Sequence, residues 1–131
     1  MKNGYTILIV ILVLTAVGIL IITTVNFLGV DETKMSLSQR DSGLGLYLST
    51  ACAEEALMRI RERATYTTSG LRILIDSARR YYCWFSVVNR DPPKYIYTRS
   101  EIANFPRNLE IKIESIERRT GRIKIGYWIE K

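Results

Sequence analysis

The chain has 131 residues, with 19 Lys and Arg against 13 Asp and Glu, a net charge of +6, and no His. Without His, the most frequent general base and the most frequent metal ligand are both absent, and two Cys are too few for a zinc site without carboxylate ligands. The roughly 100 residues that follow an apolar first segment are enough for one ordinary domain and too few for two.

The first segment is uncharged from Ile7 to Val25. As a helix these residues would be about 28 Å long, close to the roughly 30 Å hydrocarbon core of a bilayer, so we predict a membrane helix. A cleaved secretory signal would have a shorter apolar core and a small-residue cleavage site, and neither is found here. A plain signal anchor remains an alternative, with Lys2 in the cytoplasm and the rest of the chain carried across the membrane.

The border of this segment reads Gly4-Tyr5-Thr6, followed by the aliphatic run and Gly18. The pattern resembles the N-terminus of type IV pilins and type II secretion pseudopilins. The resemblance implies that a prepilin peptidase removes residues 1–4, cutting after Gly4, and that Tyr5 becomes N-methylated. It also implies that residues 5–30 form a helix that first spans the cytoplasmic membrane, with the N-terminus in the cytoplasm, and then enters the core of an extracellular filament. Thr6, Ile9 and Gly18 would contribute to filament assembly.

Two positions depart from the family pattern. Ile9 stands where the family usually has Glu, and Asn26 stands where it commonly has Pro. In a filament, that Glu neutralises the buried N-terminal ammonium of a neighbouring subunit, and a buried charge without such a partner is costly. A chain with Ile9 cannot supply this carboxylate. The resemblance therefore favours a minor subunit at or near the filament tip.

Residues 31–66 are expected to continue the helix outside the membrane, with a bend or an unwound stretch near Asp41–Gly45 because Gly weakens helices. On a helical wheel two apolar sets separate. One set consists of Leu44, Tyr47, Leu48, Ala51 and Met58. The other, mostly small, consists of Gly45, Ser49, Cys52, Ala53, Ala56, Leu57, Ile60 and Ala64.

Cys52 and Cys83 are too far apart in sequence for a C-x-x-C redox motif. Outside the cytoplasm they would form a structural disulfide, and the alternative is two buried free thiols. If they pair, the small set must face the strand that carries Cys83. Leu44, Tyr47, Leu48 and Met58 would then face neighbouring subunits; alternatively, both sets are covered by this chain itself.

Residues 67–131 are expected to form a small antiparallel sheet. The expected strands are 71–75, 81–88, a short edge strand 94–99, 109–114 and 122–129, with a connection at 101–108 that contains Pro106. The inner side chains of the last hairpin would be Leu109, Ile111, Ile113, Ile123, Ile125, Tyr127 and Ile129. The predicted fold is thus α+β and pilin-like: a long N-terminal helix, transmembrane in its first half, packed by its second half on the sheet.

No nucleophile–base arrangement, phosphate-binding Gly loop or metal-ligand spacing is found in the sequence, so we expect no catalysis, no cofactor and no small-molecule substrate. The expected function is that of a minor pilin or pseudopilin whose partners are other pilin-like subunits. The alternative is a single-pass anchor whose external domain binds a partner without joining a filament. DNA is a further candidate partner, since several arginines lie in predicted turns: Arg79, Arg80, Arg118, Arg119 and Arg122.

Overall fold

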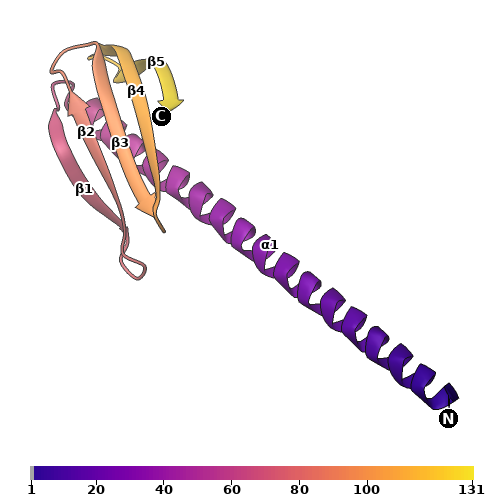
Figure 1. Cartoon of the computed structure of the whole chain (residues 1–131). Coiled ribbons are helices and arrows are strands. Elements are labelled where there is room, and N and C mark those ends of the chain that lie inside the picture. Colours follow the sequence, from indigo (N-terminus) through magenta and orange to yellow (C-terminus); the bar gives the residue numbers. More distant parts are fainter. Residues whose placement is uncertain (1) are drawn as a thin grey trace. The chain divides into compact units, whose positions relative to one another are not determined.

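The computed structural model describes residues 2–131, and side chains from Asn3 onward. It consists of one long helix followed by five antiparallel strands in the order β1-β2-β3-β4-β5, so the predicted α+β class is confirmed (Figure 1). The elements are α1 (Lys2–Glu62), β1 (Thr68–Asp76), β2 (Tyr81–Val88), β3 (Lys94–Ile102), β4 (Phe105–Glu117) and β5 (Arg122–Glu130).

The chain divides into two units, one ending at Gln39 and one comprising Arg40–Lys131. The first unit is the N-terminal part of α1. The second, here called the head, contains the rest of α1 and the sheet. Within the head α1 stays helical through Gly43 and Gly45, so the expected unwound stretch is not found. At Gly45 the helix packs closely against β4, since an added Cβ would lie 3.1 Å from Arg107 Cγ.

The hydrophobic core lies between α1 and one face of the sheet. Small residues of the helix, including Cys52, Ala53 and Ala56, are fully buried there. Small side chains let the helix backbone approach the strands closely, while larger ones from the sheet fill the space. The sheet contributes Cys83, Phe85, Val87, Ile96, Ile111 and Ile113. The prediction that the small set faces the strand carrying Cys83 is confirmed.

The middle of the sheet differs from the prediction. β3 is the central strand, not an edge strand, and the expected connection 101–108 is instead a hairpin joining β3 to β4. Ala103 and Asn104 form its two-residue turn, with φ of 49° and 68°. A turn with two positive φ values matches the twist of paired strands. Pro106 is tolerated because it is only the second residue of β4.

The last strand also corrects one expectation. Ile125 pairs with Ile113, but Tyr127 pairs with Lys112, so Gly126 is an extra residue that shifts the register. Such a bulge moves the following side chains to the opposite face. Tyr127 and Ile129 therefore lie on the face turned away from α1, although the sequence pattern had placed them against the helix.

Candidate assembly surfaces

In the described part of the first unit, the apolar segment of α1 is almost entirely exposed. The helix is long and apolar enough to cross a membrane, and the most apolar window within it is 0% buried. Large side chains such as Leu14 and Leu20 are about two-thirds exposed. Exposing a contiguous apolar surface of this length to water is unfavourable, so this segment requires lipid or other helices around it.

The hydroxyl groups within this segment are satisfied by the helix itself. The Oγ1 atom of Thr15 donates to the carbonyl of Leu12 at 2.9 Å, and that of Thr24 donates to the carbonyl of Leu20 at 2.8 Å. Thr23 makes the same kind of bond. A hydroxyl that is hydrogen-bonded to its own helix costs little to transfer into an apolar environment. The threonines are therefore compatible with a membrane or with a helix bundle.

The expected processing and assembly residues lie on this helix. Tyr5 is 72% exposed, Ile9 is also exposed, and Gly18 is partly covered. Gly4 and Thr6 are helical, and the space around Gly4 is open to a side chain. Met1 and the Lys2 side chain, which belong to the expected leader 1–4, lie outside the described residues. These positions establish accessibility only; cleavage and N-methylation remain predictions.

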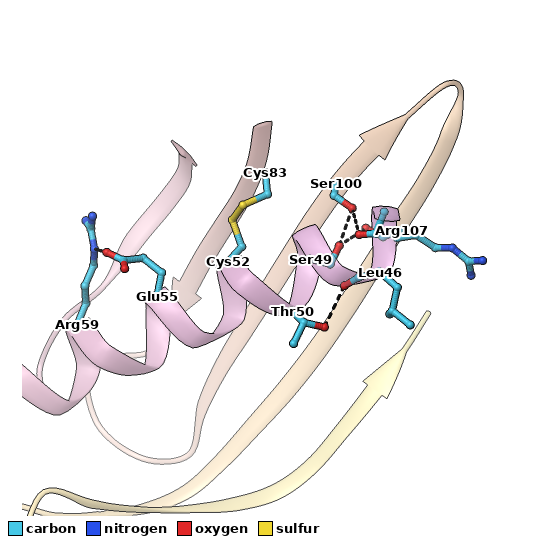
Figure 2. The surroundings of a disulfide bond; sticks show 10 residues. Leu46, Ser49, Thr50, Cys52, Glu55, Arg59, Cys83, Ser100 and Arg107 are labelled. Atoms are coloured by element: carbon cyan, nitrogen blue, oxygen red, sulfur yellow. Dashed lines mark hydrogen bonds and ion pairs between the residues drawn. A yellow bond between two sulfur atoms is a disulfide. The ribbon is translucent and has the colours of Figure 1, made fainter. Parts of the chain in front are cut away.

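In the head, a disulfide joins α1 to β2 (Figure 2). The bond links Cys52 to Cys83, whose Cα atoms are 6.1 Å apart, and both residues are fully buried. It closes a loop across 31 positions of sequence. In the chain-entropy model such a crosslink stabilises the folded state by about 3.5 to 4 kcal/mol.

A buried polar cluster lies one helical turn before the disulfide (Figure 2). Ser49 Oγ donates to the carbonyl of Arg107 at 3.0 Å and lies 2.8 Å from Ser100 Oγ, which in turn donates to the carbonyl of Gly45. The two hydroxyl groups have two protons for three contacts, so two of the three contacts are hydrogen bonds at any one time. The cluster joins α1 to both strands of the β3–β4 hairpin, and it was missed from the sequence because that hairpin was not predicted.

The side of α1 that does not contact the sheet carries exposed apolar residues. Tyr47 is 76% exposed and Met58 is 61% exposed, as expected for side chains that would face neighbouring subunits. Leu44 is partly covered, whereas Leu48 is buried and is not accessible to a neighbour. Leu48 lies one turn before Cys52, only about 40° away on the helical wheel, so it turns towards the sheet.

A concave surface lies at the end of α1, lined in part by Met58, Arg59 and Tyr66. The Arg59 guanidinium donates a hydrogen bond to Glu55 at 2.8 Å and a second one to the Tyr66 hydroxyl. These two bonds raise the pKa of Arg59. The guanidinium lies 5.8 Å from the centre of the Phe85 ring, within cation–π range. Arg59 is therefore engaged within the head, and its main effect is to fix the last turn of α1.

Comparisons with protein-family models, curated proteins and solved structures find no match to this chain.

Within residues 2–131, no group of three or more His, Cys, Asp or Glu side chains is placed to hold a metal ion. The arrangement has two apolar surfaces instead: the exposed helix of the first unit, and the Tyr47–Met58 side of α1 in the head. Both are suited to contacts with lipid or with other chains.

Proposed function

We propose that this protein is a minor pilin or pseudopilin, a structural subunit at or near the tip of a type IV pilus-like filament. One observation carries the proposal: an uncovered apolar helix is continuous with a helix that packs on a disulfide-linked antiparallel sheet. The same helix thus combines a segment suited to lipid with a segment that belongs to a folded head.

In this proposal a prepilin peptidase removes residues 1–4 and Tyr5 becomes the methylated N-terminus. The helix resides in the cytoplasmic membrane with the head outside, and it then transfers into a filament core made of equivalent helices. The membrane and the filament core are both apolar, so the apolar surface of the helix stays in a favourable environment during the transfer. An external motor needs to supply only the remaining free-energy difference between the two environments.

The position near the tip follows from Ile9. A buried ammonium without a counter-charge carries a desolvation penalty of several kcal/mol. Ile9 cannot pair with the N-terminal ammonium of a neighbouring subunit, because its side chain has no polar atom. A subunit of this kind fits best where it has neighbours on one side only. The exposed Tyr47 and Met58 side chains would make the lateral contacts of the head.

The proposal is tested by replacing Gly4 with Val. The change should block leader removal and keep the protein out of the filament fraction, because the peptidase must place the chain after residue 4 in its active site. Gly29→Val is the matched control, since the space around both glycines is open to a side chain. If Gly4→Val protein is still cleaved before Tyr5, the chain is not processed as a prepilin.

The alternative is a single-pass anchor whose external domain binds a partner. It shares the exposed helix and the head but predicts no processing and no filament. Recovery of the unmodified wild-type chain from membranes only, in cells that assemble filaments, would favour it. Neither function requires a catalytic step.

A further inference from the structure

The face of the sheet turned away from α1, here called the outer face, is rich in aromatic side chains. Cys83 and Phe85 point towards α1, so Trp84 between them points outward, and its cross-strand partner Arg99 lies on the same face. The outer face carries the aromatic residues Tyr82, Trp84, Tyr95, Tyr97 and Tyr127. Solvent-facing strand positions are usually polar, so this composition suggests a recognition role.

The rings are arranged so that part of their surface is accessible. Tyr95 and Tyr97 are stacked, with ring centres 6.4 Å apart and ring planes 17° apart. Tyr97 is 43% exposed, and no described hydrogen bond holds its hydroxyl. Trp84 lines a shallow concavity together with Arg99 and Glu101. Flat π-surfaces and a guanidinium are thus available side by side.

Three carboxylates of the outer face, those of Glu101, Glu110 and Glu114, lie next to cations. Tyr127 donates to Glu110, which is also paired with Lys131, and these contacts lower the pKa of Glu110. Glu114 is paired with Lys124 at 3.1 Å. Glu101 lies 3.7 Å from Arg99, and both side chains of this loose pair are exposed, so Arg99 can still contact a phosphate. Among residues 2–131, Glu117 at the end of β4 has no cation partner, so one carboxylate of this face is not compensated.

The cations of the outer face are in excess. Among residues 2–131, Arg72 and Lys112 have no carboxylate partner, and Arg72 lies 3.5 Å from the centre of the Tyr82 ring. The β1–β2 turn beside Tyr82 adds the exposed Arg79 and Arg80. The surface is therefore complementary to a chain of negative charges.

We propose that the outer face binds single-stranded nucleic acid, independently of whether the protein joins a filament. Bases would stack on Trp84 and Tyr97, while phosphates would contact Arg72, Arg99 and Lys112. Single strands are favoured over duplexes because only unpaired bases can offer their faces to aromatic rings. A neutral polysaccharide could use the rings but would gain nothing from the excess cations.

The test measures the affinity of the full-length protein in detergent micelles for a fluorescent oligothymidine. Tyr97→Ala should weaken binding at least about fivefold, as expected for loss of one stacked base, whereas Tyr97→Phe should not. Tyr47→Ala, which removes an exposed tyrosine from the part of α1 in the head, is the matched control and should leave affinity unchanged. Intrinsic tryptophan fluorescence of each variant checks that the head remains folded.

The salt dependence gives a second readout. Arg99→Ala should reduce the slope of log affinity against log salt by about 0.7, the value for one phosphate contact with a single strand. Arg63→Ala, directly after the end of α1, should not change the slope.

Three results would overturn the proposal. The first is equal affinity for oligothymidine and for a duplex of the same length. The second is tighter binding to a neutral dextran than to oligothymidine. The third is loss of binding when Arg118 and Arg119 of the β4–β5 turn are replaced but not when Tyr97 is, which would assign the contact to that turn.

Discussion

Removal of the disulfide is expected to cost the head a large part of its stability. Replacing Cys52 and Cys83 together with Ala opens a loop that spans 31 positions. The chain-entropy model gives about 3.5 to 4 kcal/mol for this loop, and both sulfur sites are fully buried, so their truncation adds to the loss. Small domains typically have a free energy of unfolding of about 5–15 kcal/mol.

The free energy can be measured by guanidinium unfolding of the full-length protein in detergent micelles. Both tryptophans, Trp84 and Trp128, lie in the sheet, so their fluorescence reports on the head without a contribution from the membrane helix. The double variant should unfold at a much lower denaturant concentration than the wild-type protein. Wild-type protein treated with a reductant should show a comparable decrease.

Glu54→Ala is the control for a substitution on the same part of α1, because Glu54 is exposed. Its effect should stay within about 0.5 kcal/mol. A loss of less than about 1 kcal/mol in the double-cysteine variant would contradict the reasoning, because the crosslink would then contribute little to the difference between the folded and unfolded chain.

Three further predictions concern the head. Gly43→Ala should stabilise it by up to about 1 kcal/mol, whereas Gly45→Ala should gain less or lose, because its methyl would lie 3.1 Å from an arginine side chain of β4. Burial lowers the pKa of Lys94, so between that lowered value and 10.5 the unfolded chain binds more protons than the folded chain. The free energy of unfolding should therefore rise with pH in this window, and Lys94→Met should abolish the rise. Hydrogen bonding to Glu110 raises the pKa of Tyr127 to about 12, so absorbance titration should find one tyrosine ionising near that pH, absent in Tyr127→Phe.

Each of these predictions has a contrary result. Equal effects of the two glycine substitutions would show that the contact at Gly45 is relieved at no cost. The same pH dependence in wild-type and Lys94→Met protein would show that the lysine is not desolvated. The hydrogen bond of Tyr127 should persist below pH 10 and be lost as the pH passes about 12, so ionisation of all tyrosines near pH 10 would contradict it.

The strongest sequence patterns predicted their elements well. The uncharged run of residues 7–25 and the small set around Cys52 predicted α1 and its sheet-facing side. Strand 81–88 was predicted with its observed bounds, and the alternating segments of the last hairpin lie within β4 and β5. In these stretches apolar side chains recur with the period of the element, which is the signal that sequence analysis detects.

The extent of β3 was missed because its inner face is partly polar. Lys94, Thr98 and Ser100 are all buried on this face. The ammonium group of Lys94 donates to the carbonyl of Tyr66 at 2.8 Å, and Ser100 bonds into α1. Burial of polar groups is tolerated when tertiary contacts provide partners, and those partners are distant in sequence. No local pattern could reveal them.

Two local features of the other strands differ from the sequence prediction. The Ala103-Asn104 turn lacks the glycine that usually marks a tight hairpin, so the sequence predicts a loop around Pro106 instead. The bulge at Gly126 reversed the faces of Tyr127 and Ile129 and thereby concealed part of the outer face. On α1, Leu48 was assigned to the exposed set because its wheel position lies at the border between the two sets.

Processing and assembly as a pilin-like subunit are what we propose for this chain. The most direct test is the intact mass of the protein purified from membranes and from sheared filaments. We expect a chain that begins at Tyr5, carries one additional methyl group and occurs in both fractions. A chain that retains Met1 to Gly4, has no methyl group and is found only in membranes would contradict it.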